Sequence, residues 1–143
     1  MRQIKKICDD HGIRLKVVIG ASFISERYEY ECSAYYDYLY QLVMIAGEVW
    51  DFSSFHDINI NPYNFADGKH YTKAVADLMV NTIYGRESRD GFGILLTPDN
   101  ILEYTAQRYT DFKNKRGEYL MYGTVFLQDM DDPSYIPLED YGY

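Results

Sequence analysis

Short runs of β-branched and aromatic residues alternate with amphipathic segments along this 143-residue chain, and this alternation constrains the fold more than any other feature. Between the runs, apolar residues recur at steps of three and four, which predicts helices. The predicted strands are residues 13–19, 48–53, 91–96 and 118–128, and the predicted helices are 1–11, 25–46, 72–84 and 97–115. Strands separated by helices favour an α/β fold with a mainly parallel sheet and helices on its faces.

The end of the chain differs in charge from the rest. Residues 129–143 carry five acidic and no basic side chains, out of a net charge of −8 for the whole chain. We therefore expect one domain over residues 1–128 and an acidic tail over 129–143. The body retains a small negative charge, which argues against nucleic acid or an anionic membrane as partner.

Cysteine content and hydropathy exclude several classes of protein. Cys8 and Cys32 are too few and too far apart for a disulfide framework or a thiolate zinc site, and both fall on predicted apolar helix faces. No cofactor or metal is expected. The sequence shows no signal peptide and no run of 18 apolar residues, so we expect the chain as given to be cytoplasmic.

The stretch NFADGKHYTK, residues 64–73, places Asp67 and His70 three positions apart between a polar loop and a predicted helix. Hydrolysis by a serine needs a base and a third group that holds this base in the correct tautomer. Gly68 permits a positive φ, so both side chains can project the same way. We therefore take Asp67 and His70 as the candidate catalytic pair; the alternative is a structural hydrogen bond that fixes the loop.

The blocks DFSSF, NPYNFADGKHYT and VADLMV together resemble the final conserved region of the SGNH (GDSL-like) hydrolase superfamily, in the form found among bacterial surface-polysaccharide genes. The resemblance covers residues 1–116 and corresponds to the C-terminal half of such proteins, whose full-length forms can be membrane-anchored. It implies a partial three-layer, flavodoxin-like sheet. It also implies His70 as general base, Asp67 as its orienting carboxylate, and esterase or O-acyl-transfer chemistry on an acylated glycan or small ester.

The chain departs from the family pattern at the nucleophile. The first block, with its serine, is absent, as are the middle blocks whose Gly and Asn help to form the oxyanion hole. Ser22, in VVIGAS, follows a predicted strand and is the alternative nucleophile. However, no middle blocks lie between Ser22 and Asp67, so we expect Ser22 to close a turn or cap a helix.

Three hypotheses for function remain open. The chain is the C-terminal portion of an SGNH-like protein, inactive until a separate half supplies the nucleophile, or a compact esterase using Ser22, His70 and Asp67. Alternatively it is a non-enzymatic binding or assembly module, because its 16 tyrosines suit interfaces and sugar stacking. An incomplete sheet would leave an open edge, so we also expect a homo-oligomer or pairing with the missing half.

A metal site is a further alternative. His56 and Asp57 could join Asp67 and His70 as ligands, but their spacing matches no metal motif. A solvated loop is the preferred interpretation of His56, and His11 is expected to interact with the end of the first helix.

Overall fold

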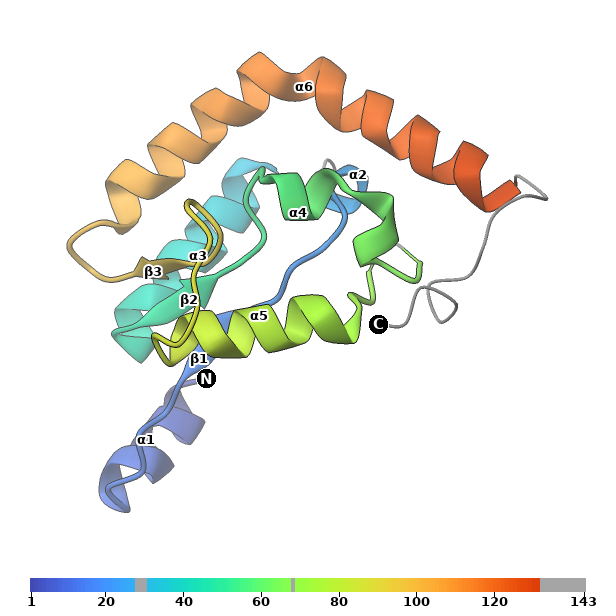
Figure 1. The fold of residues 1–143 in the computed structure, drawn as a ribbon. Helices are drawn as coiled ribbons and strands as arrows, with labels where there is room; N and C mark the ends of the chain where they lie inside the picture. The colour runs from blue at the N-terminus through green and yellow to red at the C-terminus, as the bar shows by residue number, and fades with distance from the viewer. Residues whose placement is uncertain (28–30, 68, 132–143) are drawn as a thin grey trace.

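The computed structural model describes residues 1–27, 31–67 and 69–131 and shows a small sheet surrounded by helices (Figure 1). The strands are β1 (Val17–Ile19), β2 (Val49–Asp51) and β3 (Ile94–Leu96), in the order β1-β2-β3. The helices are α1 (Arg2–Asp10), α2 (Ile24–Arg27), α3 (Ser33–Ala46), α4 (Asp57–Ile60), the 3-10 helix η1 (Pro62–Asn64), α5 (Lys73–Ile83) and α6 (Ile101–Asp131). The predicted α/β class is confirmed.

The sheet is mixed rather than mainly parallel. β1 and β2 run parallel, whereas β2 and β3 run antiparallel, with Asp51 opposite Ile94. After α5 the chain turns at Gly91 and Gly93, both at positive φ, and so enters β3 beside the carboxyl end of β2. β3 therefore runs opposite to the other two strands.

Successive side chains of β2 pack in two separate hydrophobic cores. Val49 packs with the apolar side chains of α3 and the first turn of α6, in a cluster that includes Leu39, Val43 and Ile101. Trp50 packs against the other cluster, which includes Phe52 and Met79 of α5. The alternation follows from the pleat, which points successive side chains to opposite faces.

Several predicted elements differ from those in the structure. The predicted helix 25–46 is interrupted, because Cys32 has an extended backbone before α3 begins, and Cys32 is exposed rather than on an apolar face. The predicted strand 118–128 is instead part of α6, which continues through Gly117. A single helical glycine costs only about 1 kcal/mol relative to alanine, so it does not end an established helix. At its start, α6 begins at Ile101 rather than after Thr97.

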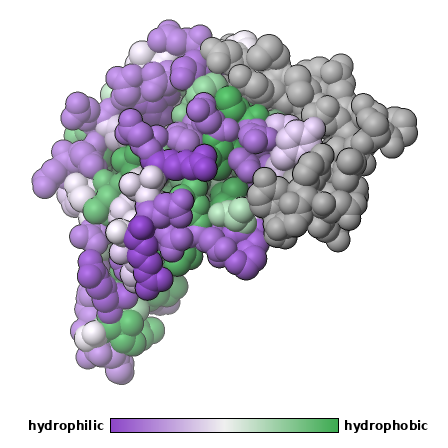
Figure 2. Space-filling model, viewed as in Figure 1, coloured by the Kyte–Doolittle hydropathy of each residue, from purple (hydrophilic) through white to green (hydrophobic). Residues whose placement is uncertain are grey.

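The ends of the molecule differ in their packing. α1 extends away from the rest, and its Ile4 and Ile7 are exposed (Figure 1). In the space-filling view, apolar residues show in the middle of the face, between hydrophilic surfaces, and again on α1 (Figure 2). α6 continues past the expected domain boundary at residue 128, and residues 132–143 of the expected acidic tail lie outside the described residues. Among the helices that the structure describes, none has the length and apolarity needed to cross a bilayer.

Candidate functional site

The Asp67–His70 pair lies on a closed turn between η1 and α5. Phe65 and Tyr71 form an antiparallel bridge at the base of this turn, and the amide of Ala66 donates to the carbonyl of His70 over 2.8 Å. Phe65 is fully buried, so it anchors the base of the turn in the core. The turn therefore presents Asp67 and His70 from a fixed base.

The two side chains meet as the sequence predicts. His70 Nδ1 lies 2.6 Å from Asp67 Oδ2, while Asp67 Oδ1 accepts the backbone N–H groups of His70 and Lys69 at 2.8 and 3.1 Å. The backbone N–H of His70, its imidazole and the N–H of Lys69 lower the pKa of Asp67 to about 2. Asp67 is therefore ionised at neutral pH. The position expected to have positive φ, residue 68, lies outside the described residues.

An ionised Asp67 fixes the role of each imidazole nitrogen. The carboxylate accepts the Nδ1 proton, so Nε2 of a neutral His70 carries the lone pair. The His70 side chain is 80% exposed and that of Asp67 50%. The structure thus pairs the imidazole with an ionised carboxylate and leaves the imidazole accessible from solution.

The turn packs beside the carboxyl end of β1. Gly20 directly follows β1, and a Cβ at this position would lie 3.1 Å from the Tyr71 ring. Lys69 Nζ lies 3.4 Å from Glu26 Oε2 in α2, which follows the same strand. Ligands of open α/β sheets bind at the carboxyl ends of strands, so the pair occupies a suitable position for a site.

Ser22 does not join the pair as a hydrogen-bond partner. Its Oγ is buried and has no partner within residues 1–27, 31–67 and 69–131, whereas His70 is largely exposed. A nucleophile must lie within hydrogen-bond reach of its base. The described residues thus bring Asp67 and His70 together but include no such contact for Ser22.

His56 acts as a structural residue. Its Nδ1 accepts the backbone N–H of Ile58 at 3.1 Å, and its Nε2 lies 3.0 Å from the carbonyl oxygen of Asp90. Both nitrogens are therefore engaged in pinning α4 to the turn before β3. Across the described part of the chain, no group of three or more His, Cys, Asp or Glu side chains is placed to hold a metal ion. As the sequence predicts, His11 Nδ1 lies 2.9 Å from the carbonyl of Ile7 in α1.

A buried ionic cluster at the carboxyl end of β2 was missed by sequence reasoning. It consists of Glu31, Asp51, Ser53, Tyr104 and Arg108. Arg108 binds Glu31 with Nε and Nη2, and its Nη1 donates to Asp51 Oδ2 at 2.8 Å. Ser53 Oγ donates to Asp51 Oδ1 at 2.6 Å and Tyr104 to Oδ2 at 2.8 Å. An Asp at the end of an apolar strand was the available signal, because a buried charge needs a partner.

The charges of this ionic cluster stabilise one another. Burial opposes ionisation of Asp51, but Arg108 and the hydrogen bonds from Ser53 outweigh it and hold the pKa of Asp51 below its usual value. Burial and the adjacent Asp51 carboxylate raise the pKa of Tyr104. Burial also disfavours the charged form of Arg108, but Asp51 reverses this and raises its pKa. Because its groups are saturated with one another, the ionic cluster is suited to holding α6 on the sheet rather than to proton transfer.

No protein-family model, curated protein or solved structure matches this chain.

Proposed function

We propose that the chain supplies the Asp–His half of an SGNH-like ester hydrolase or O-acyltransferase site that acts on an acylated cell-surface glycan. The 2.6 Å contact between His70 Nδ1 and Asp67 Oδ2, in a solvent-accessible turn, is the observation that carries this proposal. Such a site would lie on a partial three-layer, flavodoxin-like fold, which we propose for this chain together with the function. Assembly with a nucleophile-bearing half, or into a homo-oligomer, would complete the site.

In this role His70 acts as general base. Its Nε2 takes the proton of a serine hydroxyl as the serine oxygen forms a bond to the ester carbonyl. The same nitrogen then returns the proton to the leaving alcohol oxygen as the ester bond breaks. Asp67 holds the Nδ1 proton and stabilises the imidazolium formed between these steps. Water or a second hydroxyl then accepts the acyl group from the serine.

The test compares two exposed histidines in hydrolysis of p-nitrophenyl acetate by the chain alone. His70 has a carboxylate on Nδ1, whereas His11 has the Ile7 carbonyl there, which makes His11 the matched control. We expect His70→Ala and Asp67→Ala to lower the second-order rate constant several-fold and His11→Ala to leave it nearly unchanged. Equal effects of His70→Ala and His11→Ala would show that the pair does not activate the imidazole.

A fluorophosphonate probe tests the missing nucleophile separately. We expect no adduct by intact-mass analysis under conditions that label a serine esterase, because Ser22 Oγ is buried without a hydrogen-bond partner among the described residues. A stoichiometric adduct on Ser22 that is lost in His70→Ala would replace the half-site with a compact esterase.

A further inference from the structure

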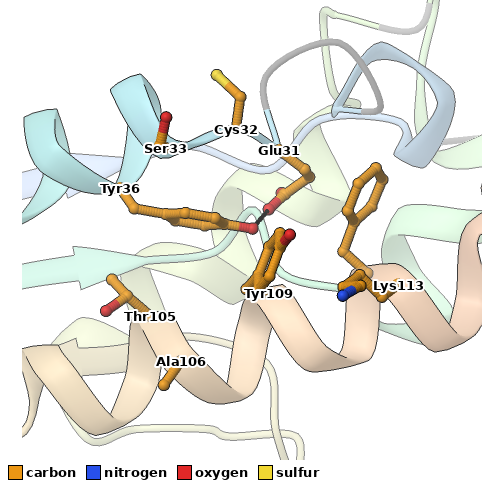
Figure 3. A pocket seen from close by; sticks show the side chains of 9 residues that line it. Glu31, Cys32, Ser33, Tyr36, Thr105, Ala106, Tyr109 and Lys113 are labelled. Carbon is orange, nitrogen blue, oxygen red and sulfur yellow. Dashed lines mark hydrogen bonds between the residues drawn. The ribbon is translucent and has the colours of Figure 1, made fainter.

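Helix α3 borders two cavities, one near each of its ends. Its start, with Ser33 and Tyr36, faces α6 across a cavity of about 740 Å³ (Figure 3). Its last turns face α1 across a groove of about 620 Å³, to which α3 contributes only the uncharged Gln41, Met44 and Ile45. The side chains that α1 contributes to this groove are all charged, namely Arg2, Lys5, Lys6, Asp9 and Asp10. Helix α1 therefore turns much of its charged face toward α3.

The apolar face of α1 is left open to solvent. Ile4 and Ile7 are three positions apart and so lie on one face of the helix, and they are 53% and 56% exposed. Apolar surface on α1 is also visible in the space-filling view (Figure 2). Cys8 is buried, so α1 packs on the chain beside Cys8 and leaves the two isoleucines uncovered. Neighbouring apolar side chains on a projecting helix form a surface that a partner can cover.

The charges of α1 are separated along its axis. Its basic side chains lie within residues 2–6, and its two acidic side chains are residues 9 and 10, in the last turn. Carboxylates at this end are unfavourable for the helix itself, because the last backbone carbonyls carry partial negative charge. The pairs Lys5–Asp9 and Lys6–Asp10 also have the lysine first, which is the weaker order for residues four apart. The pattern instead gives α1 one positive and one negative end, in the same sense as its backbone dipole.

Such a charge pattern is complementary to a second copy of itself in the antiparallel direction. The basic end of each helix then lies beside the acidic end of the other, whereas a parallel pair would bring like charges together. A two-fold axis near Cys8 sets Lys6 of one copy level with Asp10 of the other. The Lys6 and Asp10 side chains are 74% and 52% exposed, and only Oδ2 of Asp10 binds Lys6 within the described part of the chain. Asp10 can therefore keep this contact and accept a lysine of the second copy with Oδ1.

We infer that α1 is a dimerisation helix, which pairs antiparallel with α1 of a second copy of this chain about a two-fold axis. Ile4 and Ile7 of both copies are buried at the centre of this interface, and the lysines and aspartates pair at its rim. Two such helices bury less than the about 1,200 Å² of stable complexes, so the dimer is a weak one with a micromolar dissociation constant. The inference specifies the homo-oligomer named above but rests on α1 alone, since neither Asp67 nor His70 takes part.

Sedimentation velocity on the whole chain, over a concentration series through the micromolar range, tests the apolar part of the interface. We expect a monomer–dimer equilibrium without larger species. The double variant Ile4→Gln, Ile7→Gln should raise the dissociation constant by at least about tenfold, the effect of losing about 1.4 kcal/mol. Leu102→Gln is the matched control, because Leu102 is a 68% exposed apolar residue of another helix, α6, and it should leave the constant unchanged. Far-UV circular dichroism verifies that each variant is folded.

A mixing experiment tests the charge pattern and the identity of the partner together. The acidic variant, Lys5→Glu with Lys6→Glu, and the basic variant, Asp9→Lys with Asp10→Lys, should each self-associate more weakly than the native chain. An equimolar mixture of the two should form a heterodimer at least as tight as the native dimer. The basic variant also brings the net charge of −8 closer to zero, so overall repulsion between copies does not explain its weaker association.

Each other result would overturn the inference. A native chain that stays monomeric throughout the series would show that α1 does not bind a second copy. Equal weakening by Leu102→Gln, or charge variants that dimerise like the native chain, would place the interface elsewhere. A mixture that stays monomeric would exclude the pairing of α1 with α1, and larger assemblies would exclude the two-fold arrangement. Because His70→Ala should keep the dimer, the outcome is independent of the ester hydrolysis test.

Discussion

Arg108 Nη1 donates a hydrogen bond to Asp51 Oδ2 over 2.8 Å, although the two residues are 57 positions apart and both are buried. Asp51 ends β2, while Arg108 lies two turns into α6. This ion pair therefore ties the long helix to the carboxyl end of the central strand. Arg108 also positions Glu31, whose Oε1 accepts a hydrogen bond from Arg108 Nε at 3.0 Å.

Removing the guanidinium should destabilise the fold strongly. Arg108→Met leaves Glu31 and Asp51 buried without their cation, and breaking a buried pair in this way costs about 3–5 kcal/mol. Urea denaturation at pH 7 measures the loss of unfolding free energy. Arg86→Met is the control, since Arg86 is exposed, and we expect a change within about 0.5 kcal/mol. Similar losses in the two variants would contradict the role given to Arg108.

In Arg108→Met, the contribution of Asp51 to the free energy of unfolding should change with pH in the opposite direction from its contribution in the native chain. In the native chain the pKa of Asp51 is lowered. The stabilising contribution of its ionised carboxylate is therefore fully present when the pH is above the ordinary pKa of an aspartate, and it is lost as the pH falls below that value. Without Arg108, only the hydrogen bonds from Ser53 and Tyr104 oppose burial, which is the largest influence on this carboxyl, so we expect the pKa of Asp51 to rise above that of the unfolded chain. The variant is then stabilised as the pH falls from 7, because the folded state binds the additional proton.

We expect the difference in unfolding free energy between native chain and Arg108→Met to narrow between pH 7 and pH 4. Urea midpoints of both proteins at several pH values in this window measure it, and the shared effects of the remaining charges cancel in the difference. A difference that stays constant with pH would mean that Asp51 is not desolvated as the structure describes.

Two serines provide a matched test of buried hydroxyl groups. Ser53 donates to Asp51 and also accepts from Arg108 Nη1 at 3.2 Å, so Ser53→Ala should cost about 1–3 kcal/mol. Ser22 Oγ is buried with no partner among the described residues, so Ser22→Ala should be neutral or slightly stabilising. Thermal unfolding of both variants makes the comparison. A large loss of stability in Ser22→Ala would show that the Ser22 hydroxyl makes a stabilising contact, contrary to the structure.

Gly93 and Gly85 separate steric contact from backbone strain. Both have positive φ, but a Cβ at Gly93 would lie 2.3 Å from the buried Phe52 ring, whereas no described residue lies within 4 Å of a Cβ at Gly85. Gly85→Ala should cost about 1–2 kcal/mol from strain alone. Gly93→Ala should cost clearly more in urea denaturation, because the ring must also move. Equal costs would indicate that Phe52 is free to shift.

The sequence predicts those parts of the molecule that local pattern controls. Helix α5 and the end of α3 at Gly47 follow from apolar periodicity and a glycine stop, and the Asp67–His70 contact follows from the spacing of the two residues. The ionic cluster was not predictable in this way, because Arg108 meets Glu31 from 77 positions away. The direction of β3 likewise depends on long-range packing rather than on its apolar residues.

Protonation of Asp67 gives a direct test of the turn. Because its pKa is about 2, the ionised carboxylate holds the amides of Lys69 and His70 over most of the acid range, and its stabilising contribution is lost only as the pH falls from its ordinary value through about 2. At pH 3 such a group is about 10% protonated, whereas an ordinary aspartate, with a pKa of about 3.9, is about 90% protonated. NMR shifts of the His70 amide between pH 5 and pH 3, a window below the range in which an imidazole changes its charge, should therefore change little. Asp67→Asn, which keeps an acceptor oxygen but cannot ionise, should remove even that small change. A half-complete transition near pH 3.9 in the native chain, absent from Asp67→Asn, would show that the imidazole and the two amides do not stabilise the carboxylate, and the turn would then not hold Asp67 as the structure describes.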